Sequence, residues 1–348
     1  MSDEDLLMNT TDVRSEEEFE VGYTHRVIGA TVLCIISLVG IFGNSLVILA
    51  VSVSRKLQTI TNVFVVSLSI TDLLTCASLP FQSLGLVHPA GWPLDPTFCP
   101  VIGASIYILT LTSVFTLANI AFNRYYLITR RREAYQWLYK PSKLCMMQSL
   151  AWLQAILCLA IPELINIETL GYSDEQHWCS WLSKPEDPIG IYETIAFVNI
   201  FLAFLVILFC YVKIFMRVRE QRKVMASAND HASQVPTAAS ETDLQPDNQQ
   251  NTTNKPDIRR RDSQINKNLF SVVCAFFLCV MPHTLCVLIP GHEIPSIYTF
   301  ILMSANCCIN PLIYADKHPH FKQVFGCLLR CQYDKIPNPV SWVRMYVE

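Results

Sequence analysis

Seven long stretches of this 348-residue chain are apolar and almost free of charge, and they limit its possible folds more than any other feature. They cover residues 27–53, 62–87, 98–122, 144–162, 194–212, 268–291 and 294–315, and Asp72 is the only Asp, Glu, Lys or Arg within them. A helix needs about 20 mostly apolar residues to cross the hydrocarbon core of a membrane, whereas a soluble helix needs polar residues at helical spacing. The sequence therefore predicts an all-α membrane protein, a bundle of seven transmembrane helices.

The distribution of charge predicts how this bundle is oriented. Arg and Lys gather beside the spans on one side, as in the run Arg130-Arg131-Arg132, whereas the loop before residue 194 is mostly acidic. Because basic loops stay on the cytoplasmic side, we expect a multi-pass plasma-membrane protein with its N-terminus outside and its C-terminus inside. No cleavable signal precedes residue 27, so the first helix is interpreted as an uncleaved anchor. The basic runs abut membrane spans and lack interleaved aromatic residues, which argues against a nucleic-acid partner.

The remaining segments complete the predicted organisation. Residues 1–26 form an extracellular tail, in which Asn9 begins an N-x-T glycosylation acceptor, and residues 27–315 form the transmembrane domain. Residues 226–256 are polar enough to predict a disordered third intracellular loop. Within the cytoplasmic segment 316–348, apolar residues recur every three or four positions from 321 to 329, which predicts a short amphipathic eighth helix on the membrane surface.

Few of the 14 cysteines suggest a specific role. Most lie within apolar spans, where a free thiol behaves as a small hydrophobic group. Cys99 and Cys179 both lie on the predicted outer side, in an oxidising compartment, and are expected to pair as a disulfide. Cys327 and Cys331 on or near the eighth helix are candidates for palmitoylation, although a plain thiol is nearly as plausible.

One ordered set of markers, with one or two in each span, resembles the rhodopsin-like class of G-protein-coupled receptors. The markers are Gly43-Asn44, residues 68–73 with Asp72, Cys99 with Arg124 twenty-five residues later, Trp152, Tyr211, Pro282, and Asn310-Pro311 with Tyr314. The resemblance covers roughly residues 27–331 and is closest to the melatonin receptors and the related orphan receptors of the moody type. It implies a receptor that transmits the binding of an extracellular ligand to a heterotrimeric G protein, with arrestin, receptor kinases and membrane lipids as further partners.

The resemblance also assigns activation residues. Arg124, within Asn123-Arg124-Tyr125, is expected to be restrained in the inactive state and to line the G-protein pocket once the sixth helix swings outward, with Tyr211 and Tyr314 moving in behind it. Pro282 kinks that sixth helix, and Asn310 and Pro311 belong to the matching motif of the seventh.

This sequence departs from the family's pattern at three of these positions. Asn123 replaces the usual Asp, which removes a carboxylate beside Arg124, and Asp262 is the group that could reach Arg124 instead. We therefore expect measurable basal activity. Val280 stands where the family has Trp and Ala203 where it has Pro, so the fold is implied more firmly than the details of activation.

A carboxylate in mid-bilayer is costly and is usually functional, so Asp72 has a physical argument of its own. In the resembling family the matching Asp holds a sodium ion, and Ser113, Asn306 and Asn310 occupy the other matching positions. Oxygen ligands suit such a hard cation. The expected role of the ion is to hold the inactive state; a protonated, hydrogen-bonded core Asp is the alternative. No other cofactor is expected.

The resemblance places the ligand between the outer halves of the third, fifth, sixth and seventh helices. Ile106 stands where amine receptors carry Asp, which disfavours a cationic monoamine, and Ser304 stands where opsins carry the retinal-binding Lys. The remaining lining is Tyr107, Thr110, Asn199, His283 and Tyr298. It favours a small neutral or amphipathic ligand, with a peptide as the alternative.

Regulation and the competing classes complete the expectations. Arg260-Arg261-Asp262-Ser263 resembles a basophilic kinase site, in which a phosphate on Ser263 would change coupling.

A transporter would need more intramembrane charges or repeated broken helices, and an intramembrane enzyme would need a nucleophile, paired carboxylates or a metal cluster. The sequence contains neither H-E-x-x-H nor G-x-S-x-G, so an enzyme is not expected.

Overall fold

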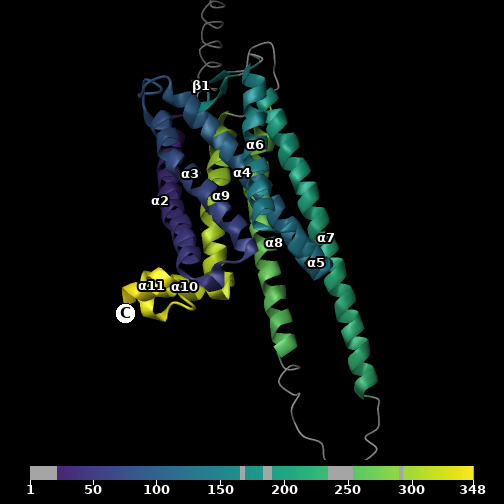
Figure 1. The fold of residues 1–348 in the computed structure, drawn as a ribbon. Coiled ribbons are helices and arrows are strands. Elements are labelled where there is room, and N and C mark those ends of the chain that lie inside the picture. Colours follow the sequence, from purple (N-terminus) through teal and green to yellow (C-terminus); the bar gives the residue numbers. More distant parts are fainter. Residues whose placement is uncertain (1–21, 165–168, 183–189, 234–253, 290–292, 348) are drawn as a thin grey trace, which may run out of the picture.

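The computed structural model describes residues 22–164, 169–182, 190–233, 254–289 and 293–347. Long helices pack side by side into one bundle (Figure 1). They are α2 (Tyr23–Val53), α3 (Ile60–Val87), α4 (Phe98–Thr129), α6 (Pro141–Leu164), α7 (Ile191–Ser233), α8 (Asn254–Cys286) and α9 (Glu293–Lys317). Six of them contain segments long and apolar enough to cross a membrane, and α8 contributes the shorter apolar segment Phe270–Cys286. The predicted seven-helix bundle is confirmed.

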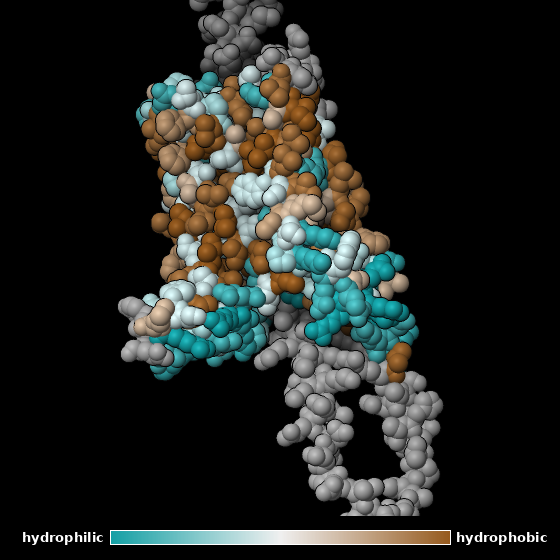
Figure 2. All heavy atoms as spheres, in the orientation of Figure 1, coloured by the Kyte–Doolittle hydropathy of each residue, from teal (hydrophilic) through white to brown (hydrophobic). Residues whose placement is uncertain are grey.

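The outside of the bundle is apolar, as a membrane requires. Leu38, Phe42 and Leu278 are 71%, 61% and 72% exposed although they lie within long helices. Figure 2 shows apolar side chains over the length of the bundle, whereas polar side chains gather towards its two ends, most densely at the lower end of the view. Exposed apolar patches of this extent mark contact with lipid or with another protein. The fold is therefore that of a multi-pass membrane protein.

Short elements define the two ends of the bundle. One end carries an antiparallel hairpin of β1 (Thr169–Ser173) and β2 (Trp178–Leu182), and we call it the hairpin end. The opposite end carries α5 (Arg132–Leu138), η1 (Arg55–Leu57), α10 (Pro319–Leu329), η3 (Tyr333–Lys335) and α11 (Ser341–Val347), and we call it the α10 end (Figure 1). The all-α prediction missed the hairpin.

The predicted eighth helix is α10. It begins directly after α9, because Pro319 at its first position lacks the N–H that a continuing helix needs, and His318 caps it. Phe321, Val324 and Phe325 are buried on one face. These residues lie at the three- and four-residue spacing that predicted an amphipathic helix.

The long loop differs from its prediction at both ends. Helix α7 continues to Ser233 and α8 begins at Asn254, so helix extends into the stretch 226–256 that was predicted to be disordered. Adding residues to an existing helix needs no new nucleus, so a polar sequence can follow the span as helix. Residues 234–253 lie outside the described part of the chain.

Candidate functional site

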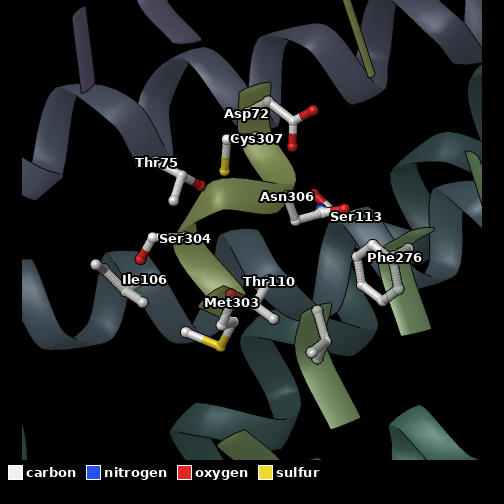
Figure 3. Close-up of a pocket in the computed structure, with 11 residues that line it drawn as sticks. Asp72, Thr75, Ile106, Thr110, Ser113, Phe276, Met303, Ser304, Asn306 and Cys307 are labelled. Carbon is white, nitrogen blue, oxygen red and sulfur yellow. The ribbon is translucent and has the colours of Figure 1, made fainter. Parts of the chain in front are cut away.

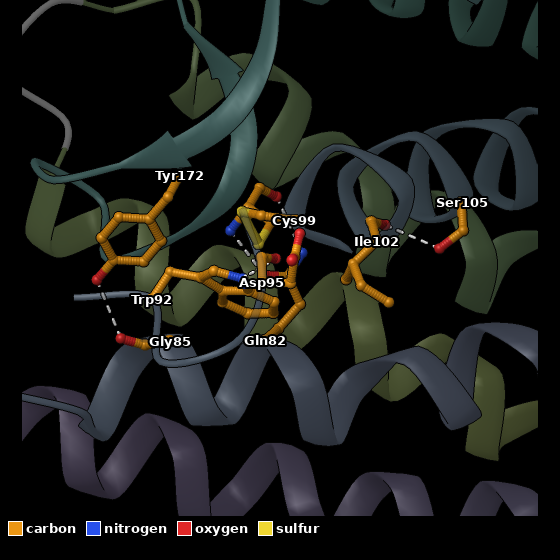
Figure 4. The surroundings of a disulfide bond; sticks show 9 residues. Gln82, Gly85, Trp92, Asp95, Cys99, Ile102, Ser105 and Tyr172 are labelled. Carbon is orange, nitrogen blue, oxygen red and sulfur yellow. Dashed lines mark hydrogen bonds between the residues drawn. A yellow bond between two sulfur atoms is a disulfide. The ribbon is translucent and has the colours of Figure 1, made fainter. Parts of the chain in front are cut away.

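The hairpin end is closed by the predicted disulfide. Cys99 lies in the first turn of α4 and Cys179 lies in β2, with their Cα atoms 5.2 Å apart. Gln82 of α3 fixes the same strand, because its amide donates to the carbonyl of Cys179 at 2.9 Å and accepts from its N–H at 2.8 Å (Figure 4). The hydroxyl of Tyr172 in β1 donates to the carbonyl of Gly85 at 3.1 Å. The hairpin is therefore tied to both α3 and α4.

Aromatic rings of the hairpin enter the bundle beneath this disulfide. Trp181 stacks on Tyr192 of α7 with ring centroids 3.5 Å apart, and Tyr107 of α4 meets Trp181 edge to face at 5.1 Å. Trp178 stacks on Phe300 of α9 at 5.1 Å. Tyr107 and Trp178 are both buried. The space between α4, α7 and α9 at this end is therefore filled by rings.

The residues predicted to line a ligand pocket do not all converge. Ile106 and Thr110 line one small cavity beside Asp72, whereas Tyr107 belongs to the aromatic cluster. His283 lies 3.1 Å from the hydroxyl of Thr299, and Tyr298 is 43% exposed.

Two of these residues point elsewhere. The hydroxyl of Tyr298 meets the imidazole of His25 on α2 at 2.5 Å. The carbonyl oxygen of Asn199 accepts a hydrogen bond at 3.2 Å from the exposed side chain of Gln154 on α6. The sequence could not indicate this position of Asn199, since a helix that is apolar all round gives no signal of which face turns inward.

Asp72 lies at the centre of the bundle, 1% exposed. Its carboxylate accepts a hydrogen bond at 2.8 Å from the amide of Asn310 on α9. Asp72, Ser113 and Asn306 line a cavity of about 20 Å³ together with Thr75 and Ser304 (Figure 3). A water molecule needs about 10–15 Å³ by the same kind of measure, so the cavity has room for one water or one small ion.

The donor set around this cavity fits a hard monovalent cation. The carbonyl oxygens of Asn306 and Asn310 and the hydroxyl of Ser304 are buried and make no hydrogen bond within the described residues. The hydroxyl of Ser113 meets that of Thr71 at 2.8 Å and has a second lone pair. No cluster of three or more His, Cys, Asp or Glu residues suited to a transition metal occurs in the described part of the chain. One carboxylate with neutral oxygens suits sodium.

Arg124 lies in α4 near the α10 end, and two groups from other elements lie within reach of its charge. It acts electrostatically on Tyr211 of α7 and on His318 between α9 and α10. Burial, followed by the charges of His320 and Arg124, lowers the pKa of His318 to about 4. His318 is therefore neutral at pH 7, and its imidazole accepts a hydrogen bond from the N–H of Phe321.

Asn123 is fully buried and faces away from solvent. Its carbonyl oxygen accepts from the hydroxyl of Thr61 on α3 at 2.8 Å, and its amide donates to the hydroxyl of Tyr135 on α5 at 3.1 Å. The residue therefore joins three helices through neutral hydrogen bonds. The hydroxyl of Tyr125 accepts from Arg130 at 3.2 Å.

Tyr211 and Tyr314 are both buried, and their hydroxyls make no hydrogen bond within the described residues. Tyr211 packs against Phe270 of α8 at 5.1 Å, whereas Tyr314 stacks on Phe321 of α10 at 5.4 Å. Two buried hydroxyls without partners are costly unless another arrangement, or water, satisfies them.

Prolines shape the helices that carry these groups. Pro282 lies inside α8, and Pro311 lies inside α9. A Cβ atom at Gly43 would lie 2.9 Å from the Cβ of Pro311, so glycine lets α2 approach α9 here. Val280, which stands where the family has Trp, is 1% exposed and lines the Asp72 cavity. Ala203 is 6% exposed in α7.

Several predicted sites have other outcomes. Asn9 and the side chains of Asp262 and Ser263 lie outside what the structure describes. Cys327 is only 9% exposed and its thiol contacts the carbonyl of Lys335 at 3.4 Å, so acylation there would need the packing to open. Cys331 is exposed.

The chain after α10 folds back under η1, which the sequence reasoning missed. The hydroxyl of Ser54 donates to the carbonyl of Pro337 at 2.7 Å, and the N–H of Val340 donates to the carbonyl of Val53 at 3.0 Å. Val340 and Val343 are buried. The sequence does contain an indication of this packing, because the apolar residues Ile336, Val340 and Val343 recur at three- and four-residue spacing.

Comparison with known proteins identifies the family. The sequence profile of the rhodopsin-family seven-transmembrane receptors matches residues 43–314, so the chain belongs to that family. It is 27% identical to 5-hydroxytryptamine receptor 4 of Homo sapiens, with 94% of this chain and 85% of that receptor covered. It is 26% identical to melatonin receptor type 1A of Ovis aries, with coverages of 85% and 75%.

Two further matches bear on length and fold. Identity to the moody receptor of Drosophila pseudoobscura pseudoobscura is 27% over 90% of this chain, and the chain spans about half the length of the moody receptors that it matches. Squid rhodopsin superposes with a TM-score of 0.71 at 21% sequence identity, covering 90% of this chain and 88% of the other. The predicted membership of the rhodopsin-like class is confirmed.

Proposed function

We propose that this receptor transmits the binding of an extracellular ligand across the plasma membrane to a heterotrimeric G protein. In this proposal the hairpin end is extracellular and the α10 end is cytoplasmic. The distribution of basic residues supports this orientation, because the Arg130-Arg131-Arg132 run lies where α4 ends and α5 begins. The disulfide at the hairpin end also favours an oxidising compartment.

The observation that carries the proposal is the position of Arg124. The residue lies near the α10 end, where α4, α7 and the α9–α10 junction meet through Arg124, Tyr211 and His318. An outward movement of α8 would take Phe270 away from Tyr211, and the hydroxyls of Tyr211 and Tyr314 could then find partners beside Arg124. This is the arrangement in which we expect the C-terminal helix of a G protein to bind.

In the same proposal, an ion in the Asp72 cavity stabilises the inactive state. Asp72, Ser113, Asn306 and Asn310 would hold a sodium ion, which supplies a counter-charge to the buried carboxylate when bound. The cavity lies between α3, α4, α8 and α9, with Val280 and Phe276 of α8 on its wall. An ion there would favour the packed arrangement of α8, and its loss would favour outward movement.

A small neutral or amphipathic ligand is favoured. Ile106 offers no carboxylate for a cationic amine, and the neighbouring Thr110 and Ser304 offer only hydroxyls. Two relatives are named for small-molecule ligands, 5-hydroxytryptamine and melatonin. A peptide that binds over the acidic hairpin end is the alternative within this class. Receptor kinases and arrestin are further proposed partners. The kinases would phosphorylate hydroxyls of the loop between α7 and α8 and Ser263, and arrestin would bind the phosphorylated loop.

The test is ligand-independent signalling across several G-protein readouts, with wild type and Arg124→Ala compared at matched surface expression. We expect the wild type to signal above untransfected cells and Arg124→Ala to lose that signal. Arg131→Ala, which removes an exposed arginine from the same end, serves as the matched control and should retain it. Solute uptake together with signalling unaffected by Arg124→Ala would instead favour a transporter.

A further inference from the structure

A groove of about 490 Å³ opens on the lipid-facing side of the bundle between α6 and α7. Its walls are mostly apolar and include Leu150, Leu153, Leu157 and Ile161 of α6 and Ile195 of α7. The four α6 residues are 45–54% exposed, and they recur every three or four positions, so they form one face of that helix. The volume is within the range of about 300–1,000 Å³ that small-molecule sites occupy.

One polar side chain interrupts this apolar face. Gln154 lies between Leu150 and Leu157, and its amide donates to the carbonyl oxygen of Asn199 on α7 at 3.2 Å. The amide of Asn199 is satisfied by the carbonyl of Ile195 at 2.8 Å. The hydrogen bonds of the described residues leave the carbonyl oxygen and the second N–H of Gln154 open to the groove. A polar group in that state is costly in hydrocarbon, where no water can satisfy it.

The depth of Gln154 limits what can satisfy it. It lies ten residues before Leu164, where α6 ends, which is about 15 Å along the helix axis. The hydrocarbon core is about 30 Å thick, so Gln154 lies near its middle. A lipid headgroup held at the membrane surface does not reach that depth. The partner must therefore lie within the hydrocarbon layer.

Charge selects among such molecules. Among the described residues, no Lys, Arg or His lines the groove. Glu163 follows at the hairpin-end rim, where its carboxylate accepts from the hydroxyl of Tyr192 at 3.3 Å. An anionic ligand would be both unpaired and repelled. A hydroxyl group can accept from the free N–H of Gln154 and donate to its carbonyl.

We propose that the groove between α6 and α7 is a binding site for a neutral lipophilic alcohol, with its hydrocarbon body against the α6 leucines and its hydroxyl on Gln154. The site is separate from the Asp72 cavity and from the residues assigned to G-protein coupling. Because the Gln154–Asn199 hydrogen bond joins α6 to α7, an occupant bonded to Gln154 also acts on the packing of these two helices.

The experiment is photolabelling of the full-length receptor in lipid nanodiscs, with peptide mapping of the label. The probes are diazirine analogues of a sterol, a long-chain alcohol and the long-chain acid of the same length. We expect the alcohols to label residues 150–161, with protection by excess unlabelled alcohol, and the acid to label at least fivefold less. Which alcohol labels more strongly distinguishes a sterol from a single-chain source.

Two variants make the assignment specific. Gln154→Leu should reduce labelling by the alcohols at least fivefold, and Leu157→Trp should reduce it by filling the groove. Leu278→Trp makes the same change on α8, where Leu278 is 72% exposed, and should leave labelling unchanged. Surface expression and thermal stability check that each variant folds.

Three results would overturn the proposal. They are labelling without protection, equal labelling by the acid and the alcohol, and cross-linking of two receptors through residues 150–161, which would make the groove a contact between copies. None of these results depends on signalling, so the site and the proposed receptor function can fail separately.

Discussion

Asn123→Asp should lower ligand-independent signalling by at least about tenfold. Asp has the shape of Asn, so its carboxylate can still accept from the hydroxyl of Thr61, and it can accept from Tyr135 once that hydroxyl reorients to donate. Both hydrogen bonds would then be accepted by a carboxylate, and they would stabilise the arrangement seen here, which we assign to the inactive state. Such bonds contribute about 1.5–3 kcal/mol, and each 1.4 kcal/mol is a factor of ten in the equilibrium between states.

The new charge would also lie one residue along α4 from Arg124, whose positive charge offsets part of the cost of burying it. The assay is basal G-protein activation at matched surface expression. Asn338→Asp is the control, because it makes the same change on an exposed residue at the same end of the bundle, and it should leave basal signalling unaltered. Basal activity of Asn123→Asp within twofold of the wild type would show that the neutral residue at 123 does not set the basal level.

Three further outcomes follow from the ends of the bundle. Replacing both Cys99 and Cys179 with Ser opens a loop with a sequence separation of 80 residues, which should cost about 4.5 kcal/mol by the chain-entropy argument and lower the melting temperature of the purified receptor. The pKa of His318 falls from its ordinary value of 6.5 to about 4, so the folded protein is most stable above pH 6.5 and loses stability as the pH falls towards 4. His318→Asn keeps a capping acceptor but does not titrate, so its melting temperature should depend less on pH between 6.5 and 4. Val343→Asp should make the chain after α10 susceptible to limited proteolysis, since burial of a valine contributes about 1.5–3 kcal/mol. Trp342→Asp is the control and should not, because Trp342 is 54% exposed.

The sequence predicted the spans because their signal is both long and local. Each of the seven stretches falls on a long helix of the structure, and the cysteines that were expected to pair do so. Asp72 and its polar neighbours were also predictable, because an intramembrane carboxylate needs partners and the family's spacing supplies them. Asp72 is indeed bonded to Asn310 and shares a cavity with Ser113 and Asn306.

The directions in which the proposed ligand-pocket residues point could not be predicted, because the rotation of an apolar helix is fixed by packing and not by its composition. Asn199 was expected to face the interior, yet it bonds to Gln154 on the lipid side. Tyr298 was expected in the same pocket, and its hydroxyl meets His25 near the start of α2, at the hairpin end. The hairpin was missed for a related reason, since its strands depend on the disulfide and on Gln82, which are distant in sequence.

Three neutral hydrogen bonds join elements at the α10 end, and this has a consequence for regulation. Asn123 joins α3, α4 and α5 through two neutral hydrogen bonds, and Ser54 joins η1 to the returning tail through another. Salt screens ion pairs near the surface but has little effect on neutral hydrogen bonds in the interior. Basal signalling set by Asn123 should therefore change little between low and physiological ionic strength in reconstituted membranes. Basal signalling of Asn123→Asp should rise with salt, because its partner Arg124 is only partly buried and solvent ions can screen that charge. An equal salt response of the two proteins would mean that charge at residue 123 does not restrain Arg124.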